Sequence, residues 1–402
     1  MAGCCRLYRC HLADHNQLEY TGIHPTHPKP LAMRRLFSID ILRATAILLM
    51  IQVHFVGNLS PREPSSQGLY DLSTILGAFA APIFTFLVGL SLWLWLNKQK
   101  SVGAEDSALR RFIIKRGILI FLFGLIFAVI IWTPAEIFNW DILALIGIST
   151  MIVYALRRVP AKYLIALSVL ILLIAPPLRE LTDYGSHWIY DEYAYDFTLS
   201  EVLLGVTLQG YFPLLPWLVF PIIGFCLGRD ILQREQTNPK AARNIPTLGL
   251  ILIVIAAVSA PISQYFPIGS SWYLSPYSFY PASTTFVISK IGFILLAFWF
   301  LRWRFDLRES SKPAGGEFIR LYSKFSLTTY AVHHAVHVWP IYLLAALNHP
   351  DDIWYYYQDA VSTPVALGLS FVFSVVFYFF LRFLDSRKQL SLEGMLRRLS
   401  ES

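Results

Sequence analysis

The fold class follows from one stretch near the start of the chain, IDILRATAILLMIQVHF, which runs from Ile39 to Phe55. Its length and apolar character predict a helix that crosses a membrane. Three ionisable residues nevertheless lie within it: Asp40, Arg43 and His54. A charged group inside a bilayer is costly, so these residues are interpreted as part of a functional site.

The composition of the whole chain agrees with a membrane protein. Of the 402 residues, 55% are hydrophobic and only 15% are charged, and the mean hydropathy is +0.52. A soluble protein of this length needs more polar surface, so we expect an all-α, polytopic bundle of membrane helices. The net charge of +7 is spread over the connections between helices, which argues against nucleic acid as a partner.

Ten segments are long enough to span a bilayer, since about 20 apolar residues cross it. They lie near residues 39–57, 75–96, 113–132, 139–156, 161–177, 211–228, 246–262, 282–301, 325–347 and 364–384. We therefore predict a bundle of about ten transmembrane helices.

The Lys and Arg residues indicate which ends of these segments face the cytoplasm. Nearly all of them fall in the N-terminal stretch, in the even-numbered connections and at the C-terminal end, whereas the odd-numbered connections hold only Arg62 and Arg179. Because positive charge is retained on the cytoplasmic side, both termini are predicted to be cytoplasmic. We expect a multi-pass protein of the cell (inner) membrane, with the lipid bilayer as its surroundings.

The chain is predicted to contain one transmembrane domain, residues 33–385, followed by a cytoplasmic tail, residues 386–402. Residues 1–32 are interpreted as a disordered extension, because Met33 followed by two arginines makes a natural start. This extension contains cysteines and histidines, but their spacing matches no common zinc-binding pattern.

The spacing of the polar residues in the first segment has a geometric consequence. Ten residues separate Arg43 from His54, and eleven steps of about 100° bring both side chains to one helix face, about 16 Å apart along the axis. The topology places Asp40 and Arg43 at the cytoplasmic end and His54 at the other end. Asp40 and Arg43 are three residues apart and can pair. The alternatives are a purely structural ion pair and an interfacial histidine that caps the helix.

The ninth segment contains three histidines within five positions: His333, His334 and His337. His333 and His337 share a helix face with Tyr330, whereas His334 is predicted to point elsewhere. Two histidines at this spacing can ligate zinc, but no carboxylate or third ligand is obvious in the sequence, so we expect no metal. Acid–base chemistry or hydrogen bonding to a substrate is favoured, with a buried structural histidine as the alternative.

Two further charged residues lie within predicted segments. Lys290 falls near the middle of the eighth segment and should face a polar cavity, a carboxylate or an anionic ligand. Asp141 opens the fourth segment at a depth similar to that of His54. Its carboxylate could orient an imidazole, as in a catalytic triad, or simply cap the helix.

These polar groups form a trail from one side of the membrane to the other, and two classes of function fit it. The first is an enzyme that takes an activated donor from the cytoplasm and modifies an acceptor on the far side. The alternative is a proton-coupled transporter or permease of a small anion or glycan precursor, in which histidines and carboxylates relay protons.

Several motifs resemble those of transmembrane acyltransferases. The motif SIDILRA (residues 38–44), followed by His54, resembles the first helix of the acyltransferase-3 family, in which a basic residue precedes a histidine by the same gap. Other motifs resemble the heparan-α-glucosaminide N-acetyltransferase catalytic-domain family: APIFTFLVG (81–89), DILALIG (141–147), YFPLLPW (211–217), FYPAS (279–283) and SLTTYAVH (326–333). The resemblance covers about residues 33–385 and depends on the order and spacing of the motifs.

This resemblance implies a membrane acetyltransferase with acetyl-CoA as its cytoplasmic acyl donor and a glycan or glycolipid as its acceptor on the far side. Arg43 matches the family's basic position and is implied to contact the anionic groups of the donor. We expect Asp40 and Lys290 to assist it in binding acetyl-CoA.

The resemblance also implies which residues take part in catalysis and which bind the acceptor. His54 matches the family's histidine and is implied to act as a base or to accept the acyl group, with His333 and Asp141 as catalytic partners. Tyr330 and His337 are expected to bind the substrate. The lysosomal branch of the family uses a histidine of the first extracytoplasmic loop as an acetyl carrier, but the corresponding loop here, residues 56–74, contains none.

Overall fold

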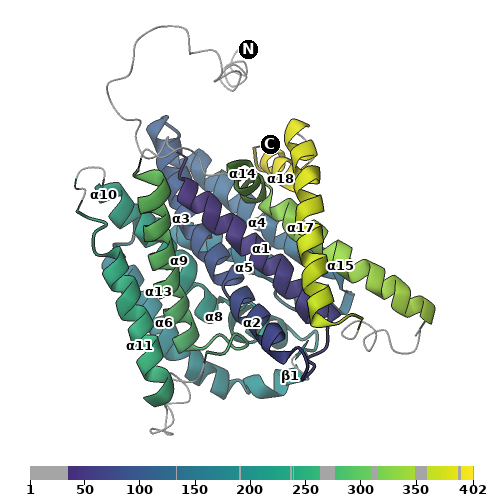
Figure 1. Cartoon of the computed structure of the whole chain (residues 1–402). Helices are drawn as coiled ribbons and strands as arrows, with labels where there is room; N and C mark the ends of the chain where they lie inside the picture. Colours follow the sequence, from purple (N-terminus) through teal and green to yellow (C-terminus); the bar gives the residue numbers. More distant parts are fainter. Residues whose placement is uncertain are drawn as a thin grey trace, which may run out of the picture.

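The structure is a computed structural model that describes residues 35–132, 134–189, 192–235, 238, 240–262, 277–308, 315–348, 360–387 and 391–401. Within these residues the chain is an all-α bundle, and a two-stranded hairpin is the sole sheet. Figure 1 shows the long helices packed side by side around α1 (Phe37–Leu59). The predicted extension, residues 1–32, lies outside the described residues.

Each of the ten predicted segments contains helix in the part that the structure describes. The main helices are α1, α3 (Ala80–Ser101), α4 (Asp106–Ile131), α5 (Ile142–Ala155), α6 (Ala161–Leu181), α9 (Val219–Cys226), α11 (Ile245–Ile262), α13 (Thr284–Leu301), α15 (Ser326–Asn348) and α17 (Thr363–Ser386). Eight helical stretches of the described residues are long and apolar enough to cross a membrane. α11 is too short for this group. α15 is long enough, but its hydropathy is lowered by the three histidines that it contains. The all-α bundle is thus confirmed, whereas the count of ten stays a prediction.

The remaining elements are short; they connect the long helices or, for α18, follow the last of them. They are α2 (Gln67–Gly77), α7 (Leu199–Leu204), α8 (Leu214–Trp217), α10 (Gln233–Glu235), α14 (Gly316–Lys324), α18 (Leu392–Glu401), the 3₁₀ helices η2 (Pro134–Phe138), η3 (Leu156–Arg158) and η4 (Tyr184–His187), the π-helical turns η5 (Gly205–Gln209), η6 (Leu227–Leu232) and η7 (Arg302–Asp306), and the antiparallel strands β1 (Trp188–Ile189) and β2 (Glu192–Tyr193).

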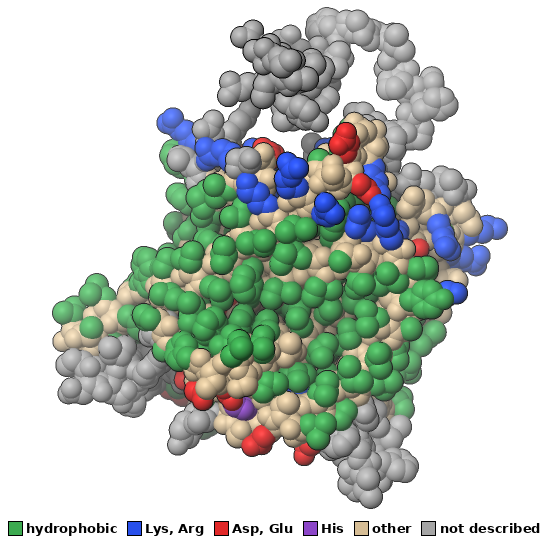
Figure 2. Space-filling view, turned by 180° about the vertical axis from the view of Figure 1, so that it is seen from behind, with side chains coloured by type: hydrophobic (Ala, Val, Ile, Leu, Met, Phe, Trp, Pro, Cys, Tyr) green, Lys and Arg blue, Asp and Glu red, His purple; other side chains and the backbone are tan. Residues whose placement is uncertain are grey.

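The outer surface of the bundle is a broad apolar band. Figure 2 shows this band with Lys and Arg gathered along its upper rim, where acidic side chains also lie, and with further acidic side chains along its lower rim. We call the upper rim, where the Lys and Arg side chains gather, the basic end. The start of α1 and the helix α18 lie at this end (Figure 1). An exposed apolar band of this extent suits a bilayer, and the positive-inside rule predicts that the basic end faces the cytoplasm.

Close backbone contact fixes α3 against α9. A Cβ atom added to Gly89 would lie 1.8 Å from the carbonyl oxygen of Pro221, and one added to Gly224 would lie 2.0 Å from the carbonyl oxygen of Phe86. Only glycine allows so close an approach, which is a common way for membrane helices to pack. This contact holds the face of α3 that carries Ser91 toward α1.

α1 occupies the centre of the bundle, where it contacts α2, α3, α13, α14, α15 and α17. Its first turn is held by Asp306 of η7, whose carboxylate accepts hydrogen bonds from the backbone N–H of Phe37 at 2.7 Å and from the hydroxyl of Ser38 at 2.5 Å. A carboxylate at a helix N-terminus is stabilising because it faces the unpaired N–H groups there. This anchor sets the depth of the polar residues that follow on α1.

Candidate active site

Arg43 lies in the second turn of α1, close to the basic end. Its guanidinium group donates to the hydroxyl of Ser91 on α3 at 2.9 Å and to that of Ser323 on α14 at 3.2 Å. Ser323 in turn donates to Asp40 at 2.6 Å. The other oxygen of Asp40 pairs with Arg35. Asp40 and Arg43 are therefore joined through Ser323 rather than by the direct pair that their spacing suggested.

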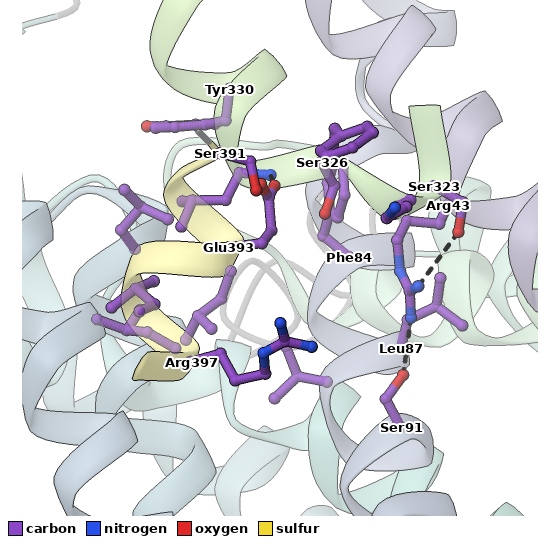
Figure 3. A pocket seen from close by; sticks show the side chains of 18 of the residues that line it. Arg43, Phe84, Leu87, Ser91, Ser323, Ser326, Tyr330, Ser391, Glu393 and Arg397 are labelled. Carbon is purple, nitrogen blue, oxygen red and sulfur yellow. Dashed lines mark hydrogen bonds between the residues drawn. The ribbon is translucent and has the colours of Figure 1, made fainter. Parts of the chain in front are cut away.

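Arg43 lines a cavity of about 750 Å³. The cavity extends from Lys324 and Arg397 at the basic end to the buried ring of Tyr330 and to Met50, which lies one helical turn from His54 on α1. Its walls are mostly apolar, and Figure 3 shows the polar side chains converging on it from different helices. A volume of this size, with few polar groups in apolar walls, is typical of ligand sites, which measure about 300–1,000 Å³.

The charged residues of the cavity are the basic side chains of Arg43, Arg116, Lys324 and Arg397 and the carboxylates of Asp385 and Glu393. Lys324 pairs with Asp385 at 2.5 Å. Arg116 on α4 and Arg397 on α18 form no hydrogen bond or ion pair with any described residue, and Figure 3 shows Arg397 reaching from α18 into the cavity. Two such guanidinium groups favour an anionic ligand, because guanidinium matches phosphate oxygens in both charge and geometry.

Glu393 joins α18 to the beginning of α15. Its carboxylate accepts hydrogen bonds from the backbone N–H groups of Leu327 at 2.7 Å and Thr328 at 2.9 Å, and from the hydroxyl of Thr328 at 2.7 Å. Those N–H groups belong to the first turn of α15 and have no partner within the helix. Glu393 therefore closes one wall of the cavity and fixes the helix that carries Tyr330 and the histidines.

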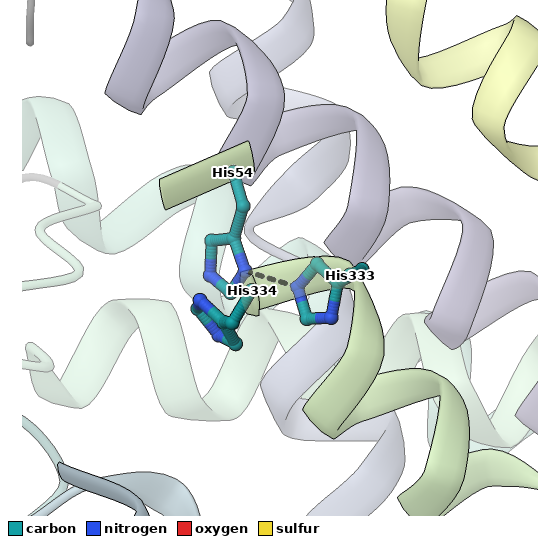
Figure 4. A group of neighbouring side chains, drawn as sticks. All are labelled: His54, His333 and His334. Carbon is teal, nitrogen blue, oxygen red and sulfur yellow. Dashed lines mark hydrogen bonds between the residues drawn. The ribbon is translucent and has the colours of Figure 1, made fainter. Parts of the chain in front are cut away.

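Four histidine rings gather at the end of α1 away from the basic end. The rings of His54 and His333 are nearly parallel, and Nδ1 of His54 lies 2.9 Å from Nε2 of His333 (Figure 4). The centroid of the His334 ring lies 4.6 Å from that of His54 and 4.2 Å from that of His333. His337 lies 5.5 Å from His333, measured between ring centroids.

The position of His334 corrects the sequence analysis. Its place on α15 turns it away from the face shared by His333 and His337, so it was predicted to point elsewhere. The structure places His54 where its ring meets both His333 and His334 (Figure 4). The prediction was wrong because the sequence of α15 does not show where α1 lies beside it.

The hydrogen bonds determine which nitrogen of each neutral ring carries the proton. Nδ1 of His333 lies 3.1 Å from the carbonyl oxygen of Thr329, and a carbonyl can only accept, so Nδ1 donates. Nε2 of His333 is then the acceptor, and Nδ1 of His54 donates to it. The lone pair of His54 is therefore on Nε2. A fixed tautomer of this kind is what a histidine base needs, because it presents one defined basic nitrogen.

The same argument applies to His337. Its Nδ1 lies 2.6 Å from the carbonyl oxygen of His333 and donates to it, so Nε2 accepts from the amide of Asn58 at 2.8 Å. Asn58 was missed in the sequence analysis, although it follows His54 by four residues and so shares its helix face. Both nitrogens of His337 are thus engaged.

Asp141 contacts a tyrosine rather than an imidazole. One carboxylate oxygen accepts from the backbone N–H of Ile142 at 2.5 Å, which makes Asp141 the N-cap of α5. The other oxygen accepts from the hydroxyl of Tyr330. The ring of Tyr330 lies 5.2 Å from that of His334, and Tyr330 also lines the cavity. Tyr330 therefore stands between the cavity and the histidines, with Asp141 holding its hydroxyl.

Lys290 lies apart from these groups. Its ammonium nitrogen sits 3.4 Å from the centre of the Phe79 ring and 5.3 Å from that of Phe286, and it is not among the residues that line the cavity. Aromatic faces stabilise a cation in such a place. A contact between Lys290 and the donor stays a prediction that the lining of the cavity does not support.

Sequence reasoning also missed three basic or acidic residues of the cavity, namely Arg116, Arg397 and Glu393. The sequence alone uses Arg116 and Arg397 only as part of the pattern of basic residues that predicts topology, and it gives Glu393 no role. Only the packing of α18 against α4 and α15 brings them together.

The chain matches the family described as "Heparan-alpha-glucosaminide N-acetyltransferase, catalytic" over residues 35–266. The match covers more than half of the chain and includes Arg43, His54, Arg116 and Asp141, whereas α15 and its histidines follow it. A comparison with curated proteins found no match. With its apolar helices and its cavity beside a histidine cluster, the chain belongs to the heparan-α-glucosaminide N-acetyltransferase catalytic-domain family of membrane-bound acetyltransferases.

Proposed function

We propose that this enzyme transfers an acetyl group from acetyl-CoA, bound at the basic end, to a hydroxyl or amine of a glycan or glycolipid at the opposite end. The observation that supports this direction is the place of Tyr330, which lines the cavity and also contacts the histidine cluster. A donor bound in this cavity would therefore lie next to the proposed base. In this proposal the protein resides in the cell (inner) membrane with both termini in the cytoplasm.

The cavity suits the donor in charge and in size. Coenzyme A carries several phosphate charges on a long, flexible chain, and Arg43, Arg116 and Arg397 present guanidinium groups along one cavity. The apolar walls formed by residues such as Leu87 and Ile146 suit the uncharged part of the chain. We assign Arg116 and Arg397 to the phosphates, because neither forms a hydrogen bond or salt bridge with another described residue.

His54 is proposed as the base. The acceptor oxygen or nitrogen bonds to the acetyl carbon, and Nε2 of His54 takes the proton that the acceptor hydroxyl or amine loses. The bond from the acetyl carbon to sulfur then breaks. Coenzyme A leaves as a thiol after gaining a proton. His333 holds the tautomer through the bond between Nε2 and Nδ1 of His54. Asn58 is proposed to bind the acceptor beside His54 through its amide oxygen, while His337 orients the Asn58 side chain by accepting from its amide nitrogen.

The catalytic unit is proposed to include α18 as well as residues 33–385. α18 belongs to the segment predicted as a cytoplasmic tail, yet it contributes Glu393, Leu396 and Arg397 to the cavity.

The alternative of a proton-coupled transporter has no comparable support, since the family to which the chain belongs consists of acetyltransferases.

Purified protein in nanodiscs, incubated with acetyl-CoA labelled in the acetyl group and a panel of amino sugars, glycans and glycolipids, tests the proposal. We expect labelled product with at least one acceptor and displacement of bound acetyl-CoA by free coenzyme A. Absence of specific acetyl-CoA binding at concentrations up to the millimolar range would contradict it, whatever acceptors are tried. In the same assay, the Arg111→Gln variant should bind acetyl-CoA as wild type does, because Arg111 lies on α4 but does not line the cavity.

A further inference from the structure

We propose that His54, His333 and His334 form a binding site for one divalent transition-metal ion, with zinc as the expected ion. One ring nitrogen from each of the three side chains lies within 4.8 Å of those of the other two. The sequence of α15 alone predicts no metal site, because it supplies no third ligand. The structure brings that third imidazole from α1.

The distances suit an ion after small side-chain rotations. In a tetrahedral site with zinc–nitrogen distances of about 2.0–2.1 Å, the ligand nitrogens lie about 3.3 Å apart. The pair formed by His54 and His333 is slightly closer, at 2.9 Å, and the third nitrogen is within 4.8 Å. An ion would therefore push the nitrogens of His54 and His333 apart from 2.9 Å to about 3.3 Å and draw His334 inward by at most about 1.5 Å.

A second, independent observation concerns His334. The residue is only 4% exposed, and its Nδ1 atom has no hydrogen-bond partner among the described residues. The rings around it, those of Phe127, Trp132 and Tyr330, offer no acceptor at that nitrogen. A buried polar atom without a partner costs about 1–3 kcal/mol, and coordination to an ion would remove that cost.

The surroundings of His333 resemble those of metal ligands. Nδ1 of a ligating histidine usually donates to a carbonyl or carboxylate, which orients the ring and leaves Nε2 for the ion. Here Thr329 supplies that carbonyl at 3.1 Å. Imidazole nitrogens suit zinc, copper and nickel rather than magnesium or calcium. His54 is only half-buried, which leaves a route for the ion and a fourth position for hydroxide or water.

Occupation of the site has a consequence for His54. Coordination through its Nδ1 moves the ring proton to Nε2, so the base loses its lone pair. The ion is therefore expected to inhibit acetyl transfer reversibly. This consequence depends on the proposed function, whereas the binding of the ion does not.

The test is ion binding by the full-length protein, measured in nanodiscs by equilibrium dialysis with Zn²⁺ and by the visible absorption of Co²⁺. Cys4, Cys5 and Cys10 are replaced by serine in every protein tested, whereas the buried Cys226 and the histidines of residues 1–32 remain identical in all variants. Wild type is compared with His334→Gln, His334→Asn and His333→Leu. The matched control is His337→Gln, because both nitrogens of His337 are already engaged.

We expect wild type and His337→Gln each to bind one additional ion per chain that the other three variants do not bind. With Co²⁺, this additional ion should show the absorption bands of a tetrahedral site. Loss of a ligand should weaken binding by more than the 10- to 100-fold that is typical when a ligand loses its hydrogen-bond partner. Equal binding by all variants would overturn the proposal, and so would an equal loss in His337→Gln. Two different substitutions of His334 are included so that the unfolding of one variant does not decide the result. Each variant must also elute from a size-exclusion column as a single species. Acetyl-CoA binding by wild type is measured in parallel and reports on the proposed function separately.

Discussion

Nδ1 of His54 lies 2.9 Å from Nε2 of His333, although 278 residues of chain separate the two histidines. The carbonyl of Thr329 fixes the proton of His333, so this single contact also decides that Nε2 of His54 carries the lone pair. The contact joins α1, which begins beside the cavity, to α15, which carries the other three histidines of the cluster. It provides the base on which the proposed chemistry depends.

Replacing His54 by Gln is expected to lower kcat for acetyl transfer by about 10²- to 10⁴-fold, the range that a general base contributes. KM for acetyl-CoA should change little, because His54 does not line the donor cavity. Steady-state assays with labelled acetyl-CoA measure both values. His187→Gln serves as the control, since His187 pairs with Glu201 away from the cluster. Full kcat in His54→Gln would remove His54 from the mechanism.

Replacing Arg116 or Arg397 by Gln is expected to raise the Kd for acetyl-CoA by about 10- to 100-fold. A hydrogen bond to a charged group contributes about 1.5–3 kcal/mol, and each 1.4 kcal/mol corresponds to a tenfold change. The binding of dephosphorylated pantetheine analogues should be unaffected in both variants. Calorimetric titration with acetyl-CoA provides the measurement.

The controls for this prediction are Arg111→Gln and Arg398→Gln, which remove positive charge from the same two helices without touching the cavity. If these variants weaken acetyl-CoA binding as much as Arg116→Gln and Arg397→Gln, general electrostatics explains the effect and the assignment of the phosphate contacts is wrong.

Glu393→Ala is expected to destabilise the protein by about 1–2 kcal/mol, the usual effect of removing a helix cap. The substitution leaves the N–H groups of Leu327 and Thr328 without their carboxylate. Because Glu393 also forms a wall of the cavity, acetyl-CoA binding should weaken as well. Thermal unfolding of the detergent-solubilised protein reports the first effect, and Glu401→Ala, on the same helix, is the control. An unchanged Tm and an unchanged Kd together would show that α18 is not part of the catalytic unit.

Gly89→Ala is expected to destabilise the bundle by at least about 1–3 kcal/mol, the typical effect of overpacking. Its new methyl group would lie 1.8 Å from a backbone oxygen of α9, which cannot move aside as a side chain would. Gly57→Ala is the matched control, because no atom lies within 4 Å of its new methyl group. Unfolding of both variants in mixed micelles gives the comparison. Equal stability of the two would contradict the direct contact between α3 and α9.

The features that depend on local sequence could be predicted. A helix has a fixed period, so the common face of Arg43 and His54 follows from their spacing alone, and hydropathy identifies each helical segment. The partners of these residues could not be predicted. Asp40 and Arg43 are neighbours on α1, but Ser323 from a distant helix comes between them.

The cavity and the fourth histidine depend on tertiary packing. Arg397 near the C-terminus lines the cavity only because α18 packs against α4 and α15. His334 joins the cluster only because α1 lies beside α15. In both cases the deciding contact joins residues far apart in the chain, and a single sequence contains no record of such contacts.

The direction of transfer is the central claim, and sided proteoliposomes test it most directly. Protein is reconstituted with a C-terminal tag whose accessibility to protease gives the orientation, and labelled acetyl-CoA is supplied on one side only. The account predicts acetylated acceptor when acetyl-CoA is on the side of the tag and the acceptor is on the other side, with loss of product in His54→Gln. Product formed only when acetyl-CoA is on the side away from the tag would contradict it.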